Sequence, residues 1–245
     1  MKNRNFLILI SVILVACSAL LYFLHFLIFG DEHHIFIFLL HDIAFLPLEV
    51  LIVGLVIERL LAKRETEERI QKLNMVVGAF YSEIGRPLTS TLLQSTQSRN
   101  EVIEKLHVSG SWGQNDYQKA RHYIEKNASI GFDDVDLEQL RSFLVSKRPF
   151  MLRLIENPSL LEHEKFTDLL LSCFHLMEEL ETRPVLDNLP PNDITHIKND
   201  IQRAFKFLAV EWLDYMHHLK ANYPFLYSHY LRISPYQLNP SAVIE

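Results

Sequence analysis

The sequence predicts an all-α protein in which a two-helix transmembrane hairpin is followed by a cytoplasmic helical-bundle domain. Two long apolar stretches fill most of the first 64 residues. In the remainder, apolar residues recur at steps of three and four, and the alternation typical of strands is absent. The chain has only 7 glycines in 245 residues, where average usage would give roughly 17, which disfavours a turn-rich β architecture.

The first apolar stretch covers residues 6–29 and carries no formal charge. A helix of that length reaches roughly 36 Å, enough to cross a hydrocarbon core of about 30 Å. A lipoprotein signal cleaved before Cys17 is an alternative, because residues 14–16 resemble the end of such a signal. A signal's apolar core spans about 7–15 residues and is followed by polar sequence. Here residues 19–29 remain apolar, so we expect an uncleaved helix.

The second apolar stretch covers residues 35–61 and follows a short polar insert at 30–34. The insert has no lysine or arginine, whereas basic residues flank the outer ends of the two stretches: Lys2, Arg4, Arg59, Lys63, Arg64 and Arg69. Because cytoplasmic segments carry an excess of positive charge, both termini are expected in the cytoplasm. The hairpin, residues 1–64, is thus predicted to lie in the inner (cytoplasmic) membrane.

Three ionisable residues of the second stretch are candidate functional residues: His41, Asp42 and Glu49. Such groups cost a few kcal/mol each at bilayer depth and usually face a bundle interior or a water-filled cavity. In one interpretation all three are immersed, and Pro47 interrupts the helix between them. In the other, the span begins just after Asp42 and only Glu49 is immersed. His25 is the nearest candidate neighbour for His41 or Asp42.

Beyond the membrane, the second span is predicted to continue as a juxtamembrane helix over residues 65–86. Leu73, Val77, Phe80 and Ile84 form part of one apolar face of this helix. Gly85 is expected to end it as a C-cap, and Pro87 is expected to open the next element.

A cytoplasmic α-helical domain is predicted over residues 87–233, followed by a tail over 234–245. Capping residues and prolines mark its helices. Asp134 or Asp136 is expected to cap one of them. The predicted helices cover residues 87–106, 115–126, 134–146, 150–156, 158–180 and 194–220. The last and longest carries an apolar face at steps of three and four, formed by Phe205, Leu208, Trp212, Tyr215 and Leu219.

Composition and motifs exclude several function classes. The formal net charge of −6 disfavours nucleic-acid binding, which requires a basic face. The two cysteines, Cys17 and Cys173, form no CxxC pair, which suits a reducing compartment. Glycine-rich phosphate loops and the HExxH and GxSxG motifs are absent. The sequence therefore predicts no catalytic residue and no cofactor, and favours a protein that is not an enzyme.

Two predicted helices carry carboxylates and histidines near one face, as helices of di-metal bundles do. The first set is Glu164, Asp168, His175 and Glu178, and the second is Glu211, Asp214, His217 and His218. Asp214-x-x-His217 is related to the Glu-x-x-His motif of such sites. The chain has 12 histidines, so coincidental matches are expected. We therefore predict solvated helix faces and no metal ligands, and keep a metal-dependent enzyme as an alternative.

Residues 41–65 (HDIAFLPLEVLIVGLVIERLLAKRE) and 207–236 (FLAVEWLDYMHHLKANYPFLYSHYLRISPY) resemble a group of uncharacterised prokaryotic membrane proteins. These have two N-terminal transmembrane helices and a cytoplasmic helical domain. The resemblance implies architecture and location but no activity.

The leading functional hypothesis is a membrane-tethered helical interaction or signal-relay module. Its expected partners are the lipid bilayer and either another protein or further copies of this chain, with no nucleic acid. An oligomeric ion or proton pathway that uses Glu49 is an alternative, which requires several copies because one hairpin cannot enclose a pathway.

Overall fold

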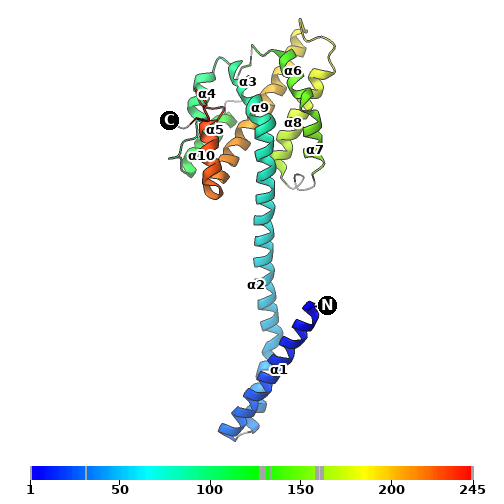
Figure 1. Ribbon diagram of the computed structural model, residues 1–245, viewed down its shortest axis with the longest axis vertical. Helices are drawn as coiled ribbons and strands as arrows, with labels where there is room; N and C mark the ends of the chain where they lie inside the picture. Colours follow the sequence, from blue (N-terminus) through cyan, green and yellow to red (C-terminus); the bar gives the residue numbers. More distant parts are fainter. Residues whose placement is uncertain are drawn as a thin grey trace. The chain divides into compact units, whose positions relative to one another are not determined.

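The computed structural model describes residues 2–30, 32–126, 131–132, 134–157, 160 and 163–243 (Figure 1). Every regular element in these ranges is helical, which confirms the all-α class. The chain divides into two compact units, Met1–Thr66 and Glu67–Glu245. Each unit is described by itself below.

The first unit contains α1 (Lys2–Phe29) and the first part of α2 (Glu32–Phe80). Gly30 has a φ of +61°, and its N–H donates to the carbonyl of Phe26 at 2.8 Å. Glycine adopts this left-handed conformation without strain, so it ends α1 and lets the chain turn into α2. The two helices include stretches that, by length and composition alone, are able to cross a membrane.

The second unit surrounds the long helix α9 (Pro191–Asn222), which packs against α3, α5, α8 and α10. The last turns of α2 contribute the buried side chains Leu73, Val77 and Phe80 to its core. Helix α9 buries the apolar face expected from its sequence, including Phe205, Leu208, Trp212, Tyr215 and Leu219. The other elements are η1 (Tyr81–Gly85), α3 (Arg86–Gln94), α4 (Arg99–Leu106), α5 (Gln114–Lys126), α6 (Leu137–Ser146), α7 (Arg148–Ile155), α8 (Glu164–Glu181) and α10 (Pro224–Arg232).

The prediction that Gly85 ends the juxtamembrane helix as a C-cap is wrong. Gly85 is right-handed helical, with φ −59° and ψ −49°, and the chain passes through the π-helical turn η1 directly into α3. Glycine is needed here for space, because a Cβ at this position would lie 2.4 Å from Cδ1 of Tyr81. Tyr81 is itself buried, and its hydroxyl donates to the carbonyl of Leu208 at 2.7 Å.

Two other predicted helices differ most from their expected bounds. The helix expected over 87–106 is divided into α3 and α4, because local serine and threonine hydrogen bonds interrupt it. There, the Ser95 hydroxyl donates to the Thr91 carbonyl, and Thr96 Oγ1 accepts from the N–H of Ser98. The helix expected from residue 158, which lies outside the described residues, begins instead at Glu164.

The predicted cap at Asp136 is confirmed, since its carboxylate accepts the N–H of Gln139 at 2.8 Å.

The chain after α10 returns to the core, where the Tyr236 ring is buried and its centroid lies 6.4 Å from that of the Trp212 ring. The centroid of the Trp212 ring also lies 5.1 Å from that of the Tyr81 ring. These aromatic contacts therefore pack η1, α9 and the C-terminal segment against one another.

Candidate functional site

A cluster of charged side chains and imidazoles lies on the seam between α8 and α9. From α8 come His175 and Glu179, which are spaced by four residues and share one side of the helix, and Arg183 follows just after the end of α8. From α9 come chiefly Asp193, His196 and Asp200. Arg183 pairs with Asp193, and His175 faces Asp200, so the two helices run antiparallel along this seam.

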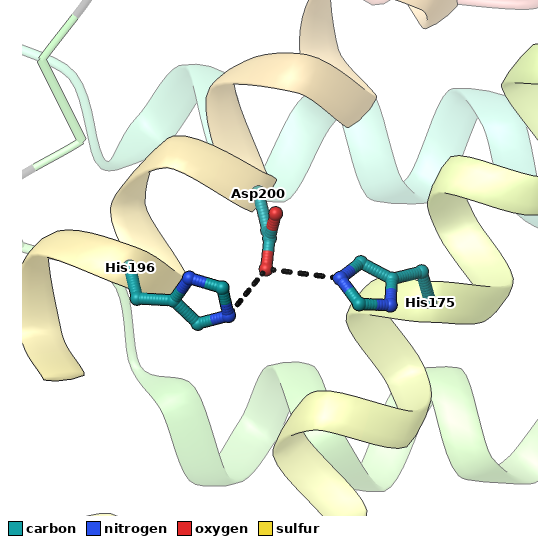
Figure 2. A group of neighbouring side chains, drawn as sticks. All are labelled: His175, His196 and Asp200. Atoms are coloured by element: carbon teal, nitrogen blue, oxygen red, sulfur yellow. Dashed lines mark ion pairs between the residues drawn. The ribbon is translucent and has the colours of Figure 1, made fainter.

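Asp200 occupies the centre of the cluster (Figure 2). Its Oδ2 lies 3.4 Å from Nε2 of His175 and 3.4 Å from Nε2 of His196. The two imidazoles approach this carboxylate from opposite sides, one from each helix. Only 2% of the Asp200 side chain is exposed, whereas the imidazoles of His175 and His196 are 43% and 50% exposed. The centre therefore has a buried carboxylate and two imidazoles that solvent can reach.

The Asp200 carboxylate is buried without hydrogen bonds from the described residues. Apart from the two histidines, the cation that lies close to it among the described residues is Arg203, whose Nη1 is 3.0 Å from Oδ1. Burial of a carboxylate is costly unless it is paired with a cation. Asp200 thus makes this position strongly attractive to positive charge.

A second carboxylate, Glu179, borders the cluster. Its Oε2 lies 3.4 Å from Nε2 of His196, and its Oε1 lies 3.8 Å from Nε2 of His175. Arg183 donates to Glu179 Oε2 at 2.8 Å and to both carboxylate oxygens of Asp193. The hydrogen bond from Arg183 lowers the pKa of Glu179 and is also the largest cause of a lowered pKa at Asp193. Both carboxylates are therefore ionised at neutral pH.

Two imidazole nitrogens and a carboxylate oxygen form a donor set that suits divalent transition metals. The donor atoms of His175, His196 and Asp200 all lie within 4.8 Å of one another. Of the described residues, these are the ones that the structure gathers in a metal-ligand arrangement.

The first candidate set from the sequence contributes only His175 to this cluster. Glu164, Asp168 and Glu178 are exposed outside it. Glu179 belongs to the cluster in place of the predicted Glu178. A residue four positions after His175 lies closer to it around the helix than a residue three positions after it. Sequence reasoning missed His196 and Asp200, for which the available signal was their spacing of four residues on α9.

The second candidate set is not brought together. Glu211 is buried, and Asp214 is paired with Arg121 and Lys165. His217 lies against the ring of Tyr117, with centroids 4.8 Å apart, and His218 lies near Asn222.

The three polar residues of the second apolar stretch, His41, Asp42 and Glu49, are exposed on α2. Asp42 and His25 both line a hollow of about 540 Å³ between α1 and α2, as expected for neighbours. Glu49 has no ion pair or hydrogen bond among the residues that the structure describes.

Comparison with known proteins gives matches along nearly the whole chain. Residues 2–61 match the family described as MJ1433, N-terminal helical domain, and residues 69–232 match Uncharacterized protein MJ1433, C-terminal helical domain. The chain is 42% identical over 246 residues to Uncharacterized protein MJ1433 of Methanocaldococcus jannaschii, covering 100% of this chain and 98% of that protein. No solved structure matches. These matches confirm the helical part of the resemblance, and its membrane part stays a prediction.

Proposed function

We propose that this chain, which belongs to the MJ1433 family of helical proteins, is a membrane-tethered helical interaction or signal-relay module. The observation that carries the proposal is the exposure of the apolar residues of the first unit. Leu14, Val15 and Ile28, for example, are 64%, 70% and 71% exposed. A lipid bilayer is the environment that best accommodates these exposed apolar side chains.

The apolar surface of the first unit is far larger than a soluble protein tolerates. Soluble monomers rarely expose contiguous apolar patches of more than a few hundred Å². Helix α1 is apolar on all sides, and helices of that kind lie either in a protein core or in a bilayer. The second unit has a complete core of its own, which supports a tether attached to an independently packed body.

Helix α2 supports the relay part of the proposal. Its N-terminal part carries the apolar stretch, and Leu73, Val77 and Phe80 near its C-terminus are buried in the second unit. The same helix thus belongs to both units. A change in the tilt or rotation of the span can then act on the packing of those three side chains.

Reporter fusions test the tether. Fusions at Asp31 and after Arg64 should report opposite sides of the membrane, with the fusion after Arg64 in the cytoplasm, because of the flanking basic residues. Alkaline phosphatase and a fluorescent protein provide the complementary readouts. Both fusions on one side, or recovery of the intact chain in the soluble fraction, would contradict the proposal.

A second candidate function is an oligomeric ion or proton pathway, which is favoured by the lack of a partner for Glu49 among the residues that the structure describes. A carboxylic acid in a bilayer is stable when it is neutral or paired, so several copies would have to surround this residue.

Two variants of Glu49 distinguish a pathway from a structural role. If the side chain carries protons, Glu49→Gln should abolish proton flux into liposomes while the protein still inserts and assembles. If it only makes a hydrogen bond between helices, Glu49→Leu should lose the oligomer in detergent while Glu49→Gln keeps it. Unchanged flux and assembly in both variants would eliminate the pathway.

A further inference from the structure

We propose that His175, His196 and Asp200 bind one divalent transition-metal ion, with zinc the best match, and that Glu179 is its fourth ligand. This site is independent of the membrane tether. It lies wholly within the second unit, on two helices that pack along each other.

The spacing of the donor atoms is the first argument. Nitrogen and oxygen ligands lie about 2.0–2.2 Å from zinc, so two ligands of a tetrahedral site are separated by about 3.3–3.5 Å. The two distances from Asp200 Oδ2 to the imidazole Nε2 atoms are both 3.4 Å. These distances exceed the usual 2.7–3.2 Å of a hydrogen bond but match the edge of a tetrahedron. The half-exposed imidazoles need to move by only roughly 1 Å for all three donors to meet one ion.

The burial of Asp200 is the second argument. Its side chain is 98% buried, and its carboxylate points between the two imidazoles without accepting a hydrogen bond from the described residues (Figure 2). Metal coordination is one of the few arrangements that stabilise such a buried carboxylate. Arg203 Nη1 lies 3.0 Å from Oδ1, and Oδ2 is the oxygen that lies 3.4 Å from the Nε2 atom of each histidine.

The surroundings of the site supply the third argument. Arg183 bonds Glu179 through Oε2 and holds it beside both imidazoles, as groups in the outer shell of a metal site orient its ligands. Arg183 is in turn held by Asp193. With neutral histidines, three carboxylates and two arginines leave one net negative charge, which favours a divalent cation over an anion.

A metal ion at this position would link α8 to α9. It would therefore stabilise the seam of the second unit, and its loss would loosen the contact between the two helices. The partial exposure of both histidines leaves the ion a route from solvent.

Metal titration of the full-length protein tests the proposal. The protein is purified in detergent with a tag free of histidine, treated with a chelator and dialysed against Zn²⁺, Co²⁺ or Mn²⁺. Elemental analysis should find one Zn²⁺ per chain, and Co²⁺ should give the intense visible absorption of a tetrahedral site. Asp200→Asn and His196→Ala should each weaken Zn²⁺ binding by about 100-fold, while Glu179→Gln should weaken it by about 10-fold.

Matched variants outside the cluster control for nonspecific effects. Glu178→Gln, next to Glu179, and His218→Ala, on the same helix as His196, should bind Zn²⁺ like the unaltered protein. Zn²⁺ should also raise the melting temperature of these controls but not that of Asp200→Asn. The circular dichroism spectrum checks that each variant is folded, and His175→Gln replaces any variant that is not.

The proposal is wrong if the chelated protein takes up no stoichiometric Zn²⁺, Co²⁺ or Mn²⁺. Equally, Zn²⁺ binding that survives in folded Asp200→Asn, or that disappears only in His218→Ala, would place the ion elsewhere and overturn it.

Discussion

Replacing Glu211 with glutamine should raise the free energy of unfolding by about 2–3 kcal/mol at pH 8 and change it little near pH 4. Glu211 is 4% exposed in the core of the second unit, and its Oε2 has no hydrogen-bond partner among the described residues. Burial raises the pKa of this carboxyl from 4.5 to about 7, although Lys165 and Arg121 act in the opposite direction.

The direction of the pH effect follows from proton binding. Between pH 4.5 and about 7, folded Glu211 keeps its proton while the unfolded chain releases it. The contribution to stability is therefore complete below pH 4.5 and is lost as the pH rises to about 7. Above that value the folded protein must bury a charged carboxylate. Glutamine has similar size and no charge, so the variant does not lose stability in this window.

Denaturant unfolding in detergent at pH 4, 6 and 8, followed by tryptophan fluorescence, measures this effect. Glu178→Gln is the matched control, since Glu178 lies on the exposed surface of α8. Its effect should stay within about 0.5 kcal/mol at each pH. A loss of stability in Glu211→Gln at pH 8 would mean that the carboxylate is ionised and favourably paired.

Replacing Gly85 with alanine should lower the free energy of unfolding by about 2 kcal/mol. Alanine ordinarily stabilises a helix by about 1 kcal/mol relative to glycine, so the sign depends on packing. The new Cβ would lie 2.4 Å from Cδ1 and 2.8 Å from Cε1 of Tyr81. The Tyr81 ring cannot easily move away, because it stacks on the Tyr215 ring with centroids 5.7 Å apart. Its hydroxyl also donates a hydrogen bond to the Leu208 carbonyl.

Gly110→Ala provides the control for this substitution. A Cβ at Gly110 would meet nothing within 4 Å, so its effect should stay within about 0.5 kcal/mol. The same unfolding measurement compares the two variants. If Gly85→Ala were as stable as the unaltered protein, the close packing of the Tyr81 ring against Gly85 would be wrong.

The sequence by itself determined the class of the fold and much of its local structure. Helical spacing was sufficient to predict the buried face of α9, because an apolar face must be covered whichever element covers it. The cap at Asp136 was predictable because its hydrogen bond reaches only three residues along the chain. Two features, the all-α class and the apolar character of the first 64 residues, likewise depend only on composition and periodicity.

Only the tertiary structure decided the role of Gly85 and the membership of the cluster on α8 and α9. At Gly85, the local pattern of glycine and proline is typical of a helix end, but the position of the Tyr81 ring requires a glycine inside a continuous helix. In the cluster, His175 was recognisable as a potential ligand, yet its neighbours His196 and Asp200 come from another helix. Which residues meet across a seam depends on the rotation and axial offset of two helices, and these are set by packing of the whole core.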